Sequence, residues 1–196
     1  MHGLVSLDRS AIKLTHGRYI SVVWGIDSLV MATANIERFY EYVKDEGELF
    51  NRVTFHRAFI FDAESWHIMA RGLAKAFSSK TEPIMFEAGK AYGKNVIRTA
   101  LERTKDRTEL LNYLSDLASA SGWGVFRLQL WEHLLVIESE NYALADKAGG
   151  RDEPSCYFLK GVFQGISEVL FGKEATTAEL LCRSKGDDNC KFEVYF

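Results

Sequence analysis

The sequence lacks several features that define common classes of protein. It has no apolar run of about 18 residues, so no membrane-spanning helix is expected. It has no long basic block and its formal net charge is −3, which gives no support for a direct nucleic-acid surface. Residues 1–18 show no apolar stretch behind a basic start, so no secretory signal is expected and the default location is the cytoplasm.

Motifs of catalysis are also missing. We find no nucleophile elbow, no dinucleotide fingerprint and no repeat. The glycine-rich run 89–94 lacks the spacing of a phosphate loop and lies inside a helical pattern, which favours helix packing over nucleotide binding. No catalytic residue is therefore assigned, and the sequence favours a binding module over an enzyme.

Proline is scarce, with Pro83 and Pro154 as its two occurrences, and each is placed as the start of a helix. The 196 residues are 47% apolar and 13% aromatic, enough for one domain, or a domain with an extension, whose core needs no disulfides. Such an aromatic-rich core could line an apolar pocket.

Hydrophobic periodicity predicts an α+β fold with an antiparallel sheet packed against helices. Strands are expected at 19–24, 28–32, 53–62, 125–131, 134–139, 175–183 and 190–196. Helices are expected at 35–44, 64–78, 83–100, 108–121 and 154–171, with Thr81 and Glu82 as cap candidates for the third of them. Glu132 and His133 fall at the bend of a hairpin, and Gly89 and Gly93 form a flat patch on one helix face.

The three cysteines, Cys156, Cys182 and Cys190, all lie within the last 41 residues. Cys156 falls at the start of the predicted helix 154–171, where unpaired N–H groups and the helix dipole stabilise a thiolate. Cys182 and Cys190 flank a predicted turn at 186–189, which would bring their sulfur atoms together. Reduced, clustered thiols favour a closed structural zinc site, although buried thiols without a metal, or a disulfide with one spare thiol, are the alternatives.

A closed zinc site needs four ligands, and the sequence leaves the fourth open. The candidates are Glu179, His133, Asp187, Asp188 and Glu193. Glu179 lies three residues before Cys182, which puts the two side chains on opposite faces of a regular strand. A β-bulge or a strong twist would be needed to bring them to one side.

The motifs near the C-terminus resemble those of the 4-vinyl reductase domain family. They are Cys156-Tyr-Phe-Leu-Lys-Gly161-Val-Phe-Gln-Gly165, Ala178-Glu179-Leu-Leu-Cys182 and Gly186-Asp187-Asp188-Asn189-Cys190-Lys-Phe192, with weaker matches at 86–93 and 122–124. The family includes the sensor domains of phenol- and xylene-responsive transcriptional activators. It resembles more distantly the small subunits of vesicle-tethering (transport protein particle) complexes. The fold thereby implied is the one shared by ligand-binding domains of NO-signalling and Golgi-transport proteins.

The resemblance implies a zinc site formed by Cys156, Glu179, Cys182 and Cys190, which selects Glu179 among the open candidates. It also implies a division into an N-terminal, strand-rich segment at 1–64, which could serve dimerisation, and a zinc-containing ligand-binding domain at 65–196. A homodimer is expected by analogy and because symmetric dimers are common.

The function implied is that of a sensor or carrier that binds a small hydrophobic molecule, an aromatic compound or another hydrocarbon. Tyr92, Trp123, Phe126, Trp131 and His133 are the residues predicted to line its pocket. Two alternatives are implied by the same resemblance: a component of a tetrapyrrole vinyl reductase, and a scaffold subunit of the vesicle-tethering type.

Overall fold

The computed structural model describes residues 18–21, 32–35, 38–43, 48–52, 56–145 and 155–196. Its largest sheet has four antiparallel strands in the order β6-β7-β9-β8. These strands are β6 (Val125–Leu130), β7 (Leu134–Glu140), β8 (Thr176–Leu181) and β9 (Cys190–Tyr195). The predicted hairpin between β6 and β7 is confirmed, since the Trp131 N–H donates to the Leu134 carbonyl at 2.8 Å across a bend at residues 132–133.

Four α-helices accompany this sheet in the described part of the chain. They are α1 (Ala63–Phe77), α2 (Thr81–Leu101), α3 (Arg107–Ala120) and α4 (Tyr157–Phe171), with short 3₁₀ turns at η2 (Ser78–Lys80) and η4 (Arg183–Lys185). Asp62 and Asp106 cap α1 and α3 by accepting a backbone N–H three residues on. Thr81 and Glu82 lie inside α2 and do not cap it, because η2 leads directly into the helix. None of the described helices combines the length and apolar character needed to cross a membrane.

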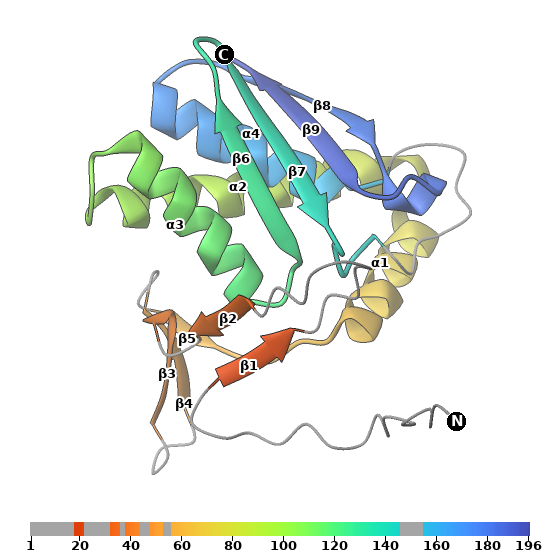
Figure 1. Cartoon of the computed structure of the whole chain (residues 1–196). Helices are drawn as coiled ribbons and strands as arrows, with labels where there is room; N and C mark the ends of the chain where they lie inside the picture. The colour runs from red at the N-terminus through yellow and green to blue at the C-terminus, as the bar shows by residue number, and fades with distance from the viewer. Residues whose placement is uncertain (1–17, 22–31, 36–37, 44–47, 53–55, 146–154) are drawn as a thin grey trace, which may run out of the picture.

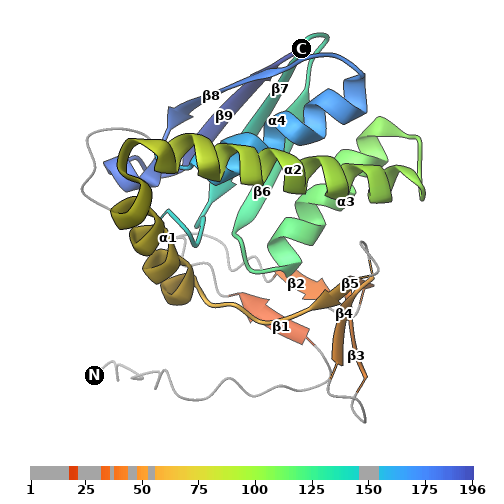
Figure 2. The same cartoon turned by 180° about the vertical axis from the view of Figure 1, so that it is seen from behind.

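The sheet and two of the helices form successive layers. In Figure 1 the sheet lies in front of α4, and in Figure 2, seen from behind, α2 lies nearest the viewer and covers α4. Helix α3 lies beside β6, while α1 projects from the start of α2. This arrangement confirms the predicted α+β class with an antiparallel sheet packed against helices.

Helices α2 and α4 cross closely because each presents two glycines to the other. A Cβ atom on Gly89 or Gly93 would lie 2.0 or 2.2 Å from a carbonyl oxygen of α4. A Cβ atom on Gly161 or Gly165 would lie equally close, at 2.0 and 2.2 Å, to carbonyl oxygens of α2. The flat patch predicted at Gly89 and Gly93 is therefore confirmed, and its partner is a second glycine pair with the same four-residue spacing.

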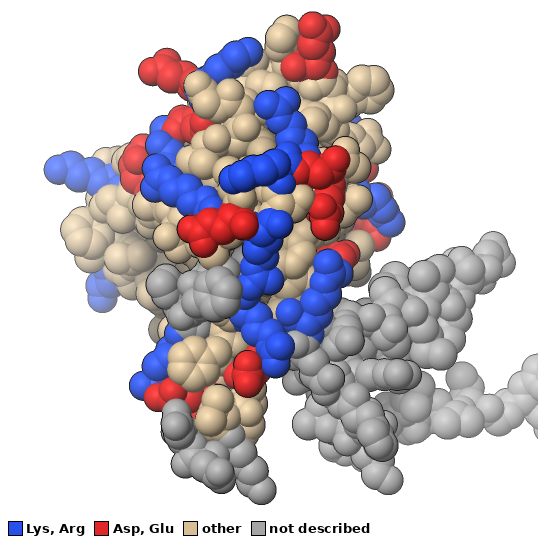
Figure 3. Space-filling view, turned by 90° about the vertical axis from the view of Figure 1, so that its left-hand side faces the viewer, with Lys and Arg blue, Asp and Glu red and all other residues tan. Residues whose placement is uncertain are grey.

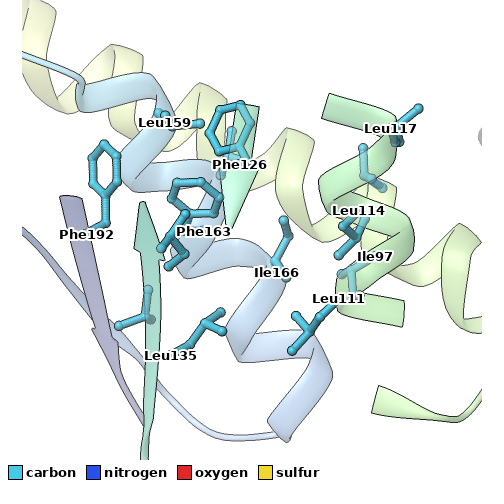
Figure 4. Close-up of a cluster of buried hydrophobic side chains, with 14 of the residues drawn as sticks. Ile97, Leu111, Leu114, Leu117, Phe126, Leu135, Leu159, Phe163, Ile166 and Phe192 are labelled. Atoms are coloured by element: carbon cyan, nitrogen blue, oxygen red, sulfur yellow. The ribbon is translucent and has the colours of Figure 1, made fainter. Parts of the chain in front are cut away.

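The core fills the space between the sheet, α4, α2 and α3. Figure 4 shows side chains from all four elements converging there. Phe163 of α4 packs on Phe126 of β6 and on Phe192 of β9, with ring centroids 6.2 and 5.3 Å apart. This packing fixes α4 on the sheet, and with it the position of Cys156 at the start of the helix.

Two further antiparallel sheets lie in the first sixty residues. β1 (Arg18–Ser21) pairs with β2 (Ala32–Asn35), and β3 (Tyr40–Val43), β4 (Glu48–Asn51) and β5 (His56–Ala58) pair in that order. The predicted strands at 19–24, 28–32 and 53–62 overlap β1, β2 and β5, and their portions at 22–24, 28–31 and 53–55 lie outside the described residues. The prediction is wrong at 59–62, where β5 has ended and the chain leads into α1, which Asp62 caps. Strand β4 was not predicted.

The predicted helix at 35–44 is wrong where the structure describes it, since residues 40–43 form β3. Phe39, directly before the strand, is 2% exposed and packs on Tyr113 of α3, with ring centroids 5.3 Å apart. Arg38 bridges to Asp116 at 3.0 Å and lies over the same rings. These contacts dock the start of β3 onto α3, and pairing with β4 then takes precedence over local helical spacing.

The face shown in Figure 3 carries charges of both signs. Lys and Arg side chains are interspersed with Asp and Glu side chains and with uncharged surface, so this face presents no extended field of one sign.

Candidate metal centre and adjacent cavity

Three thiols and one carboxylate meet where α4, β8 and β9 begin or end. Cys156 is the N-cap residue of α4, Glu179 lies in β8, Cys182 follows β8, and Cys190 opens β9. One ligand atom from each lies within 4.8 Å of those of all the others. The Cys156 sulfur is 3.8 Å from that of Cys182 and 4.0 Å from that of Cys190. Cys156 was predicted inside the helix and instead immediately precedes it, while Pro154 lies outside the described residues.

A β-bulge turns Glu179 toward the thiols. Glu179 pairs with Phe192 and Leu181 pairs with the adjacent Lys191, so Leu180 is an extra residue in β8. The extra residue reverses the alternation of side chains and brings Glu179 and Cys182 to the same side. The irregularity that the three-residue spacing demanded is therefore present.

The remaining fourth-ligand candidates lie elsewhere or have other partners. Asp187 accepts the Cys182 N–H at 2.8 Å, which stabilises the turn leading to Cys190. Glu193 accepts from the Tyr195 hydroxyl, and Asp188 is exposed. His133 is exposed at the hairpin tip beside Glu132. In the described part of the chain, Glu179 is thus the carboxylate that completes the cluster.

The four groups perturb one another's protonation. Burial raises the pKa of Glu179 to about 8, and the neighbouring Cys182 sulfur adds to this effect. Hydrogen bonds from the other two thiols lower the pKa of Cys182, and donation to Cys182 raises the pKa of Cys156. Three thiolates and a carboxylate this close together repel one another in the absence of a cation. A bound metal ion would stabilise all four in their deprotonated form.

The donor set fits zinc. Ligands at about 2.3 Å in a tetrahedron place sulfur atoms about 3.8 Å apart, close to the two separations found. The second oxygen of Glu179 accepts the Cys156 N–H at 3.1 Å, while its Oε1 is buried without a protein hydrogen-bond partner. A buried, unpartnered carboxylate oxygen beside three thiols is what a fourth metal ligand requires. Three sulfurs and a carboxylate would leave no coordination position for water.

A cavity of about 60 Å³ lies beside this centre. Its walls are almost entirely apolar and come from α2, α3, α4 and β6. The lining residues are Tyr92, Val96, Leu114, Leu117, Ala118, Ser121, Trp123, Phe126, Leu128, Leu159, Val162, Phe163 and Ile166. Tyr142 connects the two features, because its ring contacts Phe126 at 6.2 Å and nearby Cys156 contributes, after burial, to the rise in its pKa.

The structure brings together three of the five residues predicted for a pocket. Tyr92, Trp123 and Phe126 line the cavity, and the Tyr92 and Trp123 rings stack 5.9 Å apart. Trp131, which is 61% exposed, and His133 do not line it. They lie at the tip of the β6–β7 hairpin, where the alternation of strand residues gives way to the bend.

Sequence reasoning missed the walls supplied by α3 and α4. Their apolar periodicity predicted an inward face, but a packed core and a cavity produce the same pattern. Ser121 was also missed, since a serine at the end of a helix is ordinarily part of its terminus.

Fold and site together define a mixed α+β domain in which a four-ligand metal-type cluster adjoins an apolar cavity. Residues 135–196 match the family model of the vinyl-4-reductase domain. This match confirms the resemblance to the 4-vinyl reductase domain family that the C-terminal motifs indicated.

Two uncharacterized proteins of Methanocaldococcus jannaschii are similar in sequence. One is 24% identical over 58% of this chain, and the other is 35% identical over 31% of it. The alignments span 66% and 33% of those relatives, so the chain accounts for less than two thirds of either length.

Three solved structures are similar in fold. The phenol-responsive sensory domain of the transcription activator PoxR, with phenol, has a TM-score of 0.72 at 15% identity, covering 83% of this chain and 87% of that one. A vinyl-4-reductase family protein from Methanocaldococcus jannaschii has a TM-score of 0.52 at 20% identity, covering 70% and 82%. A trafficking protein particle complex subunit 3 from Naegleria fowleri, covalently bound to palmitic acid, has a TM-score of 0.51 at 13% identity, covering 68% and 91%.

Proposed function

We propose that this chain is a small-molecule-binding module, a sensor or carrier, whose ligand occupies the cavity between α2, α3, α4 and β6. The observation that carries the proposal is an apolar cavity inside an otherwise packed core. Protein interiors are close-packed, and a void is unfavourable by about 24 cal/mol per Å³. A ligand that fills this cavity of about 60 Å³ would supply contacts that its apolar walls lack.

The walls select an uncharged ligand of apolar character. The cavity lining holds no carboxylate, amine, guanidinium or imidazole among the described residues. A charged molecule would lose its hydration without gaining an opposite charge, which disfavours it strongly. A small aromatic compound or another hydrocarbon-like molecule meets this requirement.

The size of the cavity implies that its walls move when a ring enters. An engineered apolar cavity of about 150 Å³ accepts benzene, and the cavity here is less than half as large. Tyr92 is 42% exposed, and its ring stacks on that of Trp123. We expect these two rings to swing outward on binding, which would report occupancy at the protein surface.

The cluster of Cys156, Glu179, Cys182 and Cys190 belongs to the proposal as a structural zinc site. When bound, zinc would act as a fixed cross-link and supply folding free energy rather than reactivity. The protein groups would hold the start of α4 against β8 and β9, and α4 carries four of the residues that line the cavity: Leu159, Val162, Phe163 and Ile166. The proposal also includes a cytoplasmic location, a homodimer, and a division of the chain into an N-terminal segment at 1–64 and a ligand-binding domain at 65–196.

The structural neighbours support this proposal as analogies of fold. One was solved with phenol and another with covalently bound palmitic acid, and both molecules consist mainly of hydrocarbon. At 15% and 13% identity the likeness is one of fold, and the ligand panel below identifies the molecule that this chain binds.

The test is a thermal-shift panel of small aromatics, hydrocarbons, fatty acids and a tetrapyrrole, with native mass spectrometry of the purified chain and elemental analysis of its metal. Ala118→Leu adds a branched side chain to the cavity wall and is expected to abolish a ligand-dependent shift while preserving the fold. Ala76→Leu, on an exposed face of α1, is the matched control and should respond as the wild type does. A ligand shift that Ala118→Leu leaves unchanged would place binding elsewhere, and no shift or copurifying ligand at all would refute the proposal.

A further inference from the structure

The polar atoms of the cavity wall are few and can be considered one by one. Of the lining side chains, Tyr92, Ser121 and Trp123 carry a nitrogen or an oxygen, and the rest are apolar. The Tyr92 and Trp123 rings stack with an interplanar angle of 22°, and the Tyr92 ring is partly exposed, so this pair forms the outer part of the wall. Ser121, at the end of α3, provides the third polar atom.

The hydroxyl hydrogen of Ser121 is already committed. Its Oγ lies 2.7 Å from the carbonyl oxygen of Leu117, and a carbonyl only accepts, so the hydroxyl must donate there. The Oγ also lies 2.7 Å from the Tyr40 hydroxyl. Because the serine has one hydrogen, Tyr40 is the donor in this second bond. Two acceptor positions exist on a hydroxyl oxygen, and Tyr40 occupies one of them.

Tyr40 is held in place by the docking of β3 onto α3. The adjacent Phe39 is buried against Tyr113, and Arg38 pairs with Asp116 at 3.0 Å. These contacts anchor the start of β3 along the same helix that ends at Ser121. The orientation of the Ser121 hydroxyl is thus set by its own helix on one side and by the N-terminal sheet on the other.

From this hydrogen-bond arrangement we infer that Ser121 is a specificity-determining residue, whose Oγ accepts one hydrogen bond from the ligand in the cavity. The inference rests on the proposed function and names the ligand class more closely. The preferred ligand is a small uncharged ring that carries a single O–H or N–H donor. A ring bearing only an acceptor meets no hydrogen at Ser121 and gains no hydrogen bond there.

Isosteric ligand pairs test the inference. Pyrrole donates through its N–H, whereas furan has nearly the same shape and no donor; phenol and toluene form a second such pair. Dissociation constants for all four are measured by calorimetry on the zinc-loaded chain. Taking the ratio of constants within a pair, and then comparing that ratio between variants, cancels the difference in hydration of the two ligands.

Ser121→Ala is expected to shift the pyrrole-to-furan ratio of dissociation constants by roughly fivefold against pyrrole, the effect of one neutral hydrogen bond. Ser119→Ala is the matched control, because its hydroxyl likewise donates to a carbonyl four residues earlier on α3 and lies outside the cavity. It should keep the wild-type ratio. Tyr40→Phe should also keep the donor preference, since the acceptor atom remains.

An unchanged ratio in Ser121→Ala, with both ligands still bound, overturns the role of Ser121 and leaves the proposed function standing. Absence of binding by every ring to the wild type overturns both. If Ser121→Ala does not fold, Ser121→Cys replaces it, because a thiol preserves the volume and is a weak acceptor. The same shift in the ratio is then expected.

Discussion

Replacing Gly93 with alanine would place a methyl group 2.2 Å from the Val162 carbonyl oxygen and 2.9 Å from its carbon. Ordinary contact begins near 3.4 Å, so α4 would have to retreat by about 1.2 Å at this point. The obstacle is backbone rather than a flexible side chain. The strain must therefore be relieved by moving one helix away from the other.

The expected cost follows from two opposing terms. Overpacking of a well-packed core costs about 1–3 kcal/mol, and here the displaced helix also carries Leu159 and Val162 away from their contacts. Alanine gains up to about 1 kcal/mol over glycine in helix propensity. We expect Gly93→Ala to lose about 2 kcal/mol or more, equivalent to a fall in Tm of roughly 4–8 °C for a chain of this size.

Gly72→Ala provides the matched control, because Gly72 lies within α1 and a Cβ there meets nothing within 4 Å. Only the propensity gain remains at that site, so this variant should be as stable as the wild type or slightly more so. Urea denaturation followed by circular dichroism measures both. If Gly93→Ala proves as stable as Gly72→Ala, the close approach of α2 and α4 is wrong.

Three further predictions concern the metal centre, an ion-pair group and the N-terminal docking. Removing the metal with a chelator should lower both Tm and the free energy of unfolding. The loss of free energy is about 4 kcal/mol if free zinc had stood at a thousand times its dissociation constant. Adding zinc back should restore stability, and Cys182→Ser should respond neither to the chelator nor to zinc. Burial raises the pKa of Glu168, but hydrogen bonds from Lys90 and Lys94 outweigh burial and lower this pKa. The ionised Glu168 should therefore stabilise the fold fully above about pH 4.3, the pKa in the unfolded chain. This stabilisation should be lost as the pH falls through the lower pKa of the folded state. The stability gap between wild type and Glu168→Gln should accordingly close between pH 7 and pH 3, and a constant gap would contradict the pairing. Phe39→Ala should cost about 3–5 kcal/mol and expose β3 and β4 to limited proteolysis, whereas unchanged stability would argue against the burial of Phe39 on α3.

Where chemistry constrained the spacing, the sequence was informative. Three cysteines near the C-terminus predicted a common site. The offset between Glu179 and Cys182 required a bulge or a strong twist, and the structure has a bulge at Leu180. The glycine pair in α2 likewise predicted close packing. In each case the residue type has few structural roles, so its spacing along the sequence was enough to predict the contact.

Where tertiary contacts decide, the sequence was not informative. Residues Ile36, Phe39, Tyr40 and Val43 have helical spacing, yet burial of Phe39 and pairing with β4 produce a strand. The cavity walls of α3 and α4 could not be told from solid core, because a void of this size changes no pattern of hydrophobic residues. Ser121 gains its proposed role from Tyr40, which lies 81 positions earlier, and no local signal connects the two.

The bulge in β8 has a consequence beyond the orientation of Glu179. β8 is one of the two edge strands of its sheet, and an edge strand offers unpaired backbone groups on which another chain can add a strand of its own. Leu180 is 47% exposed at the extra position, where such growth would otherwise meet an apolar, regular rim. By breaking the regular ladder there, the extra residue discourages uncontrolled strand addition and fibril growth. Shortening β8 by one residue would therefore both turn Glu179 away from the thiols and leave the protein prone to aggregate.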